Sequence, residues 1–245
     1  MFFHLKSMLY ATTFLAIFET VFMIDNLVRY AIIFLILFSI WSAKKIGRSY
    51  SFVIVPVIFS ISSFILFYLI HSRPDQQAFI VISSIFYYFI FLGIYRLKNY
   101  ENDQTAKGII SGGLFATIFF FFSGFYGLYL NFSIPLWFLM FVFLAVTFVL
   151  SYYYLRILST DKNKVLTYSL ILGLAMAEIS WVINFWPFGY FTTGAIALIF
   201  YYMFWDLAQS YFTEKLSKKK IVVNLIFFSL LIGLILLSSR WQLAV

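Results

Sequence analysis

The chain has 245 residues, of which 64% are hydrophobic and only 11% are charged, and its formal net charge is +8. Soluble domains carry about one-quarter charged residues, so this composition excludes an ordinary soluble protein and predicts an integral membrane protein. At about 20 mainly apolar residues per span, the length allows about nine spans and leaves almost nothing for a soluble domain.

Two further counts narrow the possible chemistry. The chain contains no cysteine, which excludes disulfides, thiolate metal sites and a cysteine nucleophile. The basic residues occur in small groups at the ends of apolar runs. We interpret these groups as topology signals and as contacts to anionic lipid, and we expect no nucleic-acid partner.

The first apolar run, Met8 to Ile24, resembles a secretory signal, but no small-x-small cleavage site precedes Asp25. A second apolar run follows at once, so we predict an uncleaved span. The alternative is an amphipathic helix that lies in the membrane interface. Spanning is favoured because the face that carries Thr12 and Glu19 is only weakly polar.

The apolar runs together predict an all-α fold, a polytopic transmembrane helix bundle with about nine spans, or eight if the first run is interfacial. We expect a single integral membrane domain, 1–245. The predicted spans lie near residues 8–24, 28–43, 52–70, 78–97, 108–130, 136–158, 165–185, 189–211 and 221–238.

Alternate threading of these spans separates the basic residues by side. With the N-terminus inside, fourteen of the seventeen Lys and Arg residues are cytoplasmic, and only Arg29, Arg73 and Arg240 are outside. This is the bias that the positive-inside rule predicts. We therefore expect a cytoplasmic N-terminus and a C-terminus outside.

The fifth run is rich in glycine, with Gly112 and Gly113 near its start and Gly124 and Gly127 near its end. Small residues let neighbouring membrane helices approach closely. We expect close helix contacts along this run.

Glu178 is the carboxylate that fits its predicted environment least well, because ionisable residues inside a membrane are costly and mark functional sites. It lies nine residues before Pro187, which corresponds to about 13 Å below the outer boundary. The possible polar or ligand site comprises Glu178, Trp181, Asn184, Thr193 and Gly194, because small side chains across the hairpin leave room at that depth. Glu178 could couple protons or cations or anchor a ligand head group; alternatively, as a protonated acid bonded to a neighbouring helix, it holds the bundle together.

Two other acidic residues within the spans have simpler interpretations. Glu19 lies near the outer end of the first run, and we expect an ion pair with Arg29 across the hairpin. Asp206 lies near the inner interface, where we expect solvent or a basic residue such as Arg156 or Lys215. All three residues Glu19, Arg29 and Asp206 are interpreted as structural charges.

The remaining residues offer no catalytic or cofactor pattern. His4 and His71 fall on opposite membrane faces by this topology, so a histidine metal site is not expected. Neither a zinc-ligand spacing nor a glycine-rich phosphate loop occurs. We expect no cofactor, no metal and no enzymatic activity.

A Glu-x-x-Trp pattern followed by Pro-Phe-Gly runs from Glu178 to Tyr190, and an aromatic segment ending in Trp205-Asp206 follows. This stretch resembles a family of uncharacterised polytopic bacterial membrane proteins from small-genome candidate phyla. The resemblance covers the C-terminal third and implies no activity.

Two function classes remain from the sequence. The favoured one is a non-enzymatic membrane component that packs against partner membrane proteins or against copies of itself. The alternative is a small transporter, or a permease that binds lipid or a small molecule, with Glu178 as its polar anchor. Either protein would reside in the cell membrane.

Overall fold

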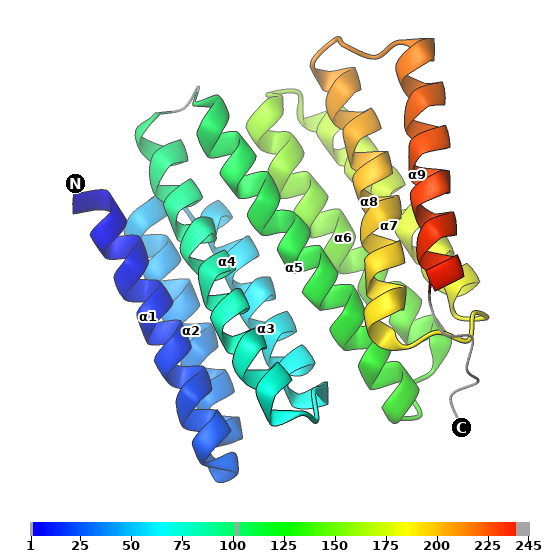
Figure 1. Ribbon diagram of the computed structural model, residues 1–245. Helices are drawn as coiled ribbons and strands as arrows, with labels where there is room; N and C mark the ends of the chain where they lie inside the picture. The colour runs from blue at the N-terminus through cyan, green and yellow to red at the C-terminus, as the bar shows by residue number, and fades with distance from the viewer. Residues whose placement is uncertain (1, 101–102, 239–245) are drawn as a thin grey trace. The chain divides into compact units, whose positions relative to one another are not determined.

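The computed structural model describes residues 2–100 and 103–238, which form nine α-helices and no strand (Figure 1). Each of these helices is long and apolar enough to cross a membrane, and the predicted all-α class with nine helices is confirmed. The helices are α1 (Phe2–Met23), α2 (Val28–Gly47), α3 (Ile54–Leu69), α4 (Arg73–Asn99), α5 (Gln104–Asn131), α6 (Leu136–Leu158), α7 (Lys162–Ile183), α8 (Tyr190–Phe212) and α9 (Lys218–Ser238). Short 3-10 turns, Asp25–Leu27 and Tyr50–Val53, precede α2 and α3.

The chain divides into two compact units, Met1–Phe121 and Phe122–Val245, called here the N-terminal and C-terminal units. The boundary falls inside α5, which therefore contributes its first part to one unit and its second part to the other. No change in hydropathy marks this boundary, because α5 is apolar on both sides of it.

In the N-terminal unit, α1 packs against α4 in antiparallel orientation. His4 Nδ1 lies 2.7 Å from the Tyr88 hydroxyl, and Gln77 Nε2 donates to Glu19 Oε1 at 2.6 Å, so residues late in α4 meet the start of α1. The predicted ion pair between Glu19 and Arg29 is wrong, since neither residue belongs to an ion pair in the described part of the chain.

Aromatic rings and hydroxyl groups fill the core of the N-terminal unit. Phe14 stacks on Tyr87 with ring centroids 4.3 Å apart. The buried Ser39 hydroxyl lies 2.8 Å from Ser60 Oγ and 2.9 Å from the Tyr87 hydroxyl, which links α2, α3 and α4. Interhelical hydrogen bonds of this kind contribute about 0.6 to 2 kcal/mol each within a membrane.

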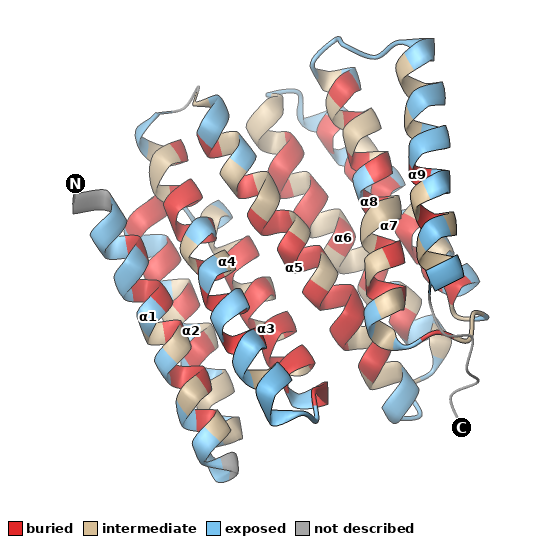
Figure 2. Cartoon of the chain, in the orientation of Figure 1, coloured by how far each residue is buried: buried red, intermediate tan, exposed pale blue. Residues whose placement is uncertain are grey.

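In the C-terminal unit, the second part of α5 packs against α6, α7 and α8. Phe122 and Phe143 lie with ring centroids 4.3 Å apart, and the Tyr126 hydroxyl donates to the Ser180 carbonyl oxygen. Gly173 brings α7 close to α6, since a Cβ there would lie 2.9 Å from the Leu144 carbonyl oxygen. Buried residues recur along α5, α6, α7 and α8 (Figure 2).

The glycines at the start of α5 behave differently from one another. A Cβ on Gly113 would lie 2.6 Å from Ile90 Cγ1. This glycine therefore permits the predicted close contact between α4 and α5. A Cβ on Gly112 would meet nothing within 4 Å. The prediction is thus confirmed for Gly113 and wrong for Gly112, because adjacent residues on a helix point in different directions.

The last helix, α9, is attached to α8 by one polar cluster and a narrow apolar contact. Asp206 forms an ion pair with Lys220 at 3.2 Å and accepts a hydrogen bond from Asn224 Nδ2 at 2.5 Å. Lys220, rather than the predicted Arg156 or Lys215, is therefore the basic partner of Asp206. Within α9, all of which the structure describes, Phe228 and Ile232 are the buried residues, and most of the helix surface is exposed (Figure 2).

Asp103 precedes the first turn of α5 and binds both ends of the adjacent loop. Its Oδ1 accepts a hydrogen bond from the Thr105 N–H at 2.8 Å, and its Oδ2 lies 2.7 Å from Arg96 Nη2. Partial burial raises the pKa of Asp103, but the backbone N–H groups of Ala106 and Thr105 and the charge of Arg96 outweigh it and hold this pKa below its ordinary value.

The lowered pKa of Asp103 predicts a pH-dependent contribution to stability. This contribution is fully present above the unfolded-state pKa and is lost as pH falls through the lower, folded-state pKa. We expect Asp103→Asn to lower the thermal midpoint modestly at neutral pH and to have a smaller effect in acid. Thermal unfolding in detergent across this pH range measures the difference, with Glu214→Gln in an exposed turn as control. An equal effect of Asp103→Asn at both pH extremes would contradict this linkage.

Candidate functional site

Glu178 lies on α7, five residues before that helix ends at Ile183. At 1.5 Å per residue, this places Glu178 about 8 Å from the helix end. The nine-residue spacing to Pro187 predicted a larger depth, about 13 Å. The difference arises because the hairpin from Asn184 to Gly189 is not helical and takes up part of that spacing.

The side chain of Glu178 is on the exposed face of α7, among large apolar residues. Leu174 is 46% exposed, Trp181 49% and Phe185 68%, and the Trp181 and Phe185 rings meet edge to face at 5.6 Å. Among the described residues, no hydrogen bond or ion pair involves the Glu178 carboxylate. Glu178 is thus a single carboxylate on an otherwise apolar, exposed stripe.

The other residues of the predicted site do not join Glu178. Thr193 and Gly194 are buried at the start of α8, where a Cβ on Gly194 would lie 1.9 Å from Ser123 Oγ on α5. The room beside Gly194 is therefore filled by Ser123 and is not open to the carboxylate. Asn184 is half-buried at the end of α7, where its N–H donates to the Ser180 carbonyl oxygen at 3.2 Å.

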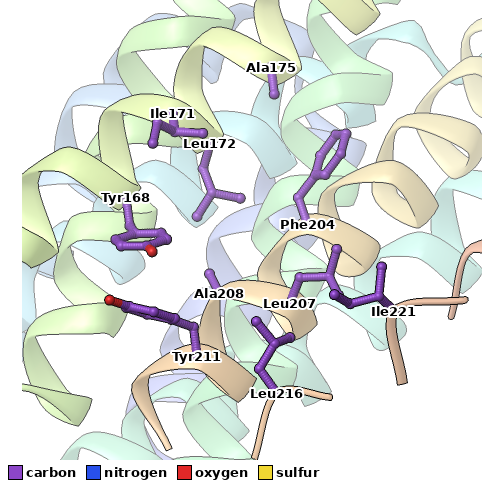
Figure 3. A pocket seen from close by; sticks show the side chains of 10 residues that line it. All are labelled: Tyr168, Ile171, Leu172, Ala175, Phe204, Leu207, Ala208, Tyr211, Leu216 and Ile221. Carbon is purple, nitrogen blue, oxygen red and sulfur yellow. The ribbon is translucent and has the colours of Figure 1, made fainter. Parts of the chain in front are cut away.

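An apolar cavity of about 300 Å³ lies between α7, α8 and the start of α9. Figure 3 shows its side chains gathered around one space, with the rings of Tyr168 and Tyr211 side by side on one wall. These two rings stack with centroids 4.8 Å apart. The lining residues are Tyr168, Ile171, Leu172 and Ala175 from α7, Phe204, Leu207, Ala208 and Tyr211 from α8, and Leu216 and Ile221 around the start of α9.

The cavity and Glu178 share one side of α7. Tyr168, Ile171 and Ala175 line the cavity at spacings of three and four residues, and the next residue in this series is Glu178. Residues at these spacings lie on the same face of a helix. The exposed stripe thus continues from the cavity towards the carboxylate.

A second cavity, of about 910 Å³, lies in the N-terminal unit between the ends of α1, α2, α3 and α4. Its lining is partly polar and includes Asn26, Arg29, His71 and Gln76. Arg29, predicted to pair with Glu19, therefore faces this cavity instead. The Gln76 side chain is held by its donation to the Ile70 carbonyl oxygen at 2.7 Å.

Sequence reasoning identified Glu178 and Trp181 but missed both cavities. The spacing of Tyr168, Ile171, Leu172 and Ala175 is also that of any lipid-facing or packed helix face, so it carries no signal for an opening. The sequence feature nearest to the first cavity is the lysine-rich segment that connects Leu216 to Ile221.

The described side chains form surfaces and cavities that can bind a ligand. Their titratable groups are not clustered at one place. Within residues 2–100 and 103–238, no group of three or more His, Cys, Asp or Glu side chains could hold a metal ion. Glu178 offers a single exposed carboxylate, and the cavity on the same side of α7 can receive an apolar chain or ring.

Comparison with known proteins gives one match. A family described as "Protein of unknown function (DUF5656)" matches residues 38–238, and the chain belongs to this family. Membership of an uncharacterised family was predicted from the C-terminal third and is confirmed, with a match that covers much more of the chain. No curated protein and no solved structure matches significantly.

Proposed function

We propose that this DUF5656 protein is a non-enzymatic integral component of a membrane protein assembly, and that the exposed face of α7 contacts the partner. Glu178, exposed on an apolar helix face without a partner in its own unit, is the observation that supports this proposal. A charged residue costs about 3 kcal/mol at the centre of a membrane helix on insertion scales, and less near the helix end where Glu178 lies. A partner that satisfies the carboxylate would offset this cost.

The chemistry of Glu178 restricts what the partner presents. A carboxylate accepts hydrogen bonds, and a protonated carboxyl group both donates and accepts. The partner is therefore a membrane helix that carries a hydroxyl, amide or basic side chain at the depth of Glu178. Leu174, Trp181 and Phe185 form the surrounding apolar contact, with Trp181 as the large aromatic anchor.

The location follows from the same helices. We place the protein in the bacterial cell membrane, with a cytoplasmic N-terminus and the lysine-rich start of α9 on the cytoplasmic side. The predicted outer location of Arg240 and of the C-terminus falls outside the described residues. The bacterial source in small-genome candidate phyla is part of the proposal and is supported by the resemblance of the C-terminal third.

Photo-crosslinking in native membranes tests this proposal. A crosslinker in place of Trp181 should capture one defined protein, and one in place of Leu230 on the exposed face of α9 should not. With the captured partner reconstituted in vesicles, Glu178→Leu should weaken association about tenfold, because interhelical hydrogen bonds contribute about 1 to 2 kcal/mol. Glu178→Gln, which keeps the shape and a carbonyl acceptor, should retain most of the affinity. Equal capture at both crosslinker positions would contradict the proposal.

A second candidate function is supported by the cavity that continues towards Glu178. In this case the protein is a permease for a lipid or small apolar molecule, and Glu178 anchors a polar group of the cargo or exchanges a proton. Glu178→Gln should then abolish pH-dependent transport while leaving any protein association unchanged. Reconstituted vesicles distinguish the two functions, because only a permease shows pH-dependent transport that Glu178→Gln abolishes, whereas only the assembly component loses partner affinity in Glu178→Leu.

A further inference from the structure

The cavity between α7, α8 and α9 opens beside a concentrated positive charge. Leu216 and Ile221 line the cavity, and the segment between them is Ser217-Lys218-Lys219-Lys220. The cavity walls are aliphatic and aromatic, with Tyr168 and Tyr211 as the polar exceptions. An apolar space and a cationic group thus lie within a few residues of each other.

The three lysines of this segment have different roles. Lys220 is engaged, since its Nζ lies 3.2 Å from Asp206 Oδ2 and also donates to Ser210 Oγ. Lys218 and Lys219 are exposed, and in the described part of the chain neither side chain has a hydrogen bond or ion pair. Two cations in the segment between the lining residues Leu216 and Ile221 are therefore available to a ligand.

Backbone geometry adds to this positive charge. The Ser217 hydroxyl accepts a hydrogen bond from the Lys220 N–H at 3.2 Å, which caps the start of α9. The other N–H groups of the first turn have no partner within the helix, and they carry the positive end of the helix dipole. No acidic residue lies in this turn to neutralise it.

We propose that this cavity holds an acyl chain of an anionic phospholipid, whose phosphate group binds Lys218 and Lys219. The volume of about 300 Å³ is at the lower end of the range of small-molecule pockets and suits one part of an acyl chain, and basic pockets between membrane helices bind anionic head groups. The acyl chain occupies the apolar space between Ala175 and Leu216, and the charged head group stays at the basic end. This site is independent of the contact proposed for Glu178.

Native mass spectrometry of the full chain, extracted in mild detergent and supplied with phosphatidylglycerol or phosphatidylcholine, tests the site. The wild-type protein should retain one tightly bound phosphatidylglycerol and no matching phosphatidylcholine. The double variant Lys218→Ala/Lys219→Ala should bind phosphatidylglycerol roughly 25-fold more weakly, since each lysine near anionic lipid contributes about fivefold. Ala175→Phe should block the cavity and also abolish retention.

A matched control distinguishes this site from general attraction of anionic lipid. Lys44→Ala/Lys45→Ala removes two adjacent, exposed lysines at the end of α2 and should leave retention unchanged. The proposal is overturned if this control loses as much lipid as the Lys218/Lys219 variant. It is also overturned if both lipids are retained equally, because the cavity would then bind acyl chains without selecting an anionic head group. Because Lys218 and Lys219 are exposed, their variant should fold normally and decides the question if Ala175→Phe does not fold.

Discussion

Replacement of Gly194 by alanine is expected to destabilise the C-terminal unit by about 1 to 3 kcal/mol, the usual cost of overpacking a close contact. The added Cβ would lie 1.9 Å from Ser123 Oγ and 2.9 Å from the Ser123 backbone nitrogen. The hydroxyl group can rotate away, but the backbone nitrogen belongs to α5 and moves only with that helix. Alanine also favours a helix by up to about 1 kcal/mol over glycine, so any net loss understates the steric cost.

Thermal unfolding in detergent measures the effect of Gly194→Ala, with Gly112→Ala as the matched control. A Cβ on Gly112 meets nothing within 4 Å, so this variant should be neutral or slightly stabilised. Ser123→Gly combined with Gly194→Ala should restore part of the stability, because it removes the hydroxyl and Cβ but not the backbone contact. Equal midpoints for Gly194→Ala and Gly112→Ala would show that α5 and α8 are not closely packed at this point.

Replacement of Asp206 by alanine is expected to loosen α9 from the C-terminal unit. The carboxylate binds Lys220 Nζ at 3.2 Å and Asn224 Nδ2 at 2.5 Å, and its removal leaves both groups without this acceptor. Hydrogen bonds to charged groups contribute about 1.5 to 3 kcal/mol. The remaining attachment of α9 includes the edge-to-face contact of Tyr202 with Phe228 at 5.4 Å.

The absence of native cysteine allows a direct measurement of this loosening. A single cysteine in place of the buried Ile232 should react with a maleimide at least tenfold faster in the Asp206→Ala background. Asp206→Asn should give an intermediate rate, since its side chain can still bond to Asn224. Asp161→Ala removes the N-cap of α7 and its exposed ion pair with Lys164 but none of the α9 contacts of Asp206, and it serves as control. An unchanged rate with Asp206→Ala would mean that apolar packing alone holds α9.

The helices themselves were predictable because long apolar runs have few alternatives. Backbone groups inside a membrane must be satisfied within the segment, so runs such as residues 136–158 form helices whatever their neighbours are. Polar residues separate the runs, and the loop around Asp103 is an example. Hydropathy marks only the apolar middle of a helix, which explains why α4 begins at Arg73 although its apolar run begins near residue 78.

Which side of each helix is buried was not predictable from the same hydropathy pattern. Alpha-helical runs that are apolar all round give no indication of which side is buried, and Glu178 was therefore expected inside, whereas it lies on the exposed face of α7. Similarly, Asp206 was expected, from its depth near the inner interface, to meet solvent or a basic residue such as Arg156 or Lys215. Its partner Lys220 is fourteen residues away and is brought close only by the antiparallel packing of α8 and α9.

Basic residues gather at one end of the C-terminal unit. Some of them lie where a helix ends and others where a helix begins, so they meet opposite ends of the helix dipole. Arg156 lies in the last turn of α6, where the negative end of the helix dipole favours a cation. Lys162 and Lys218 begin α7 and α9, where the positive end disfavours one by about 0.3 to 1 kcal/mol.

At α7 the Asp161 side chain relieves this conflict, because it accepts hydrogen bonds from the first-turn amides of Asn163 and Lys164. At α9 an uncharged serine caps the turn, and among the described residues Asp206 forms an ion pair with Lys220 only. The charges of Lys218 and Lys219 therefore stay unfavourable there. We therefore expect the first turn of α9 to be less stable than the first turn of α7, although both begin with lysine.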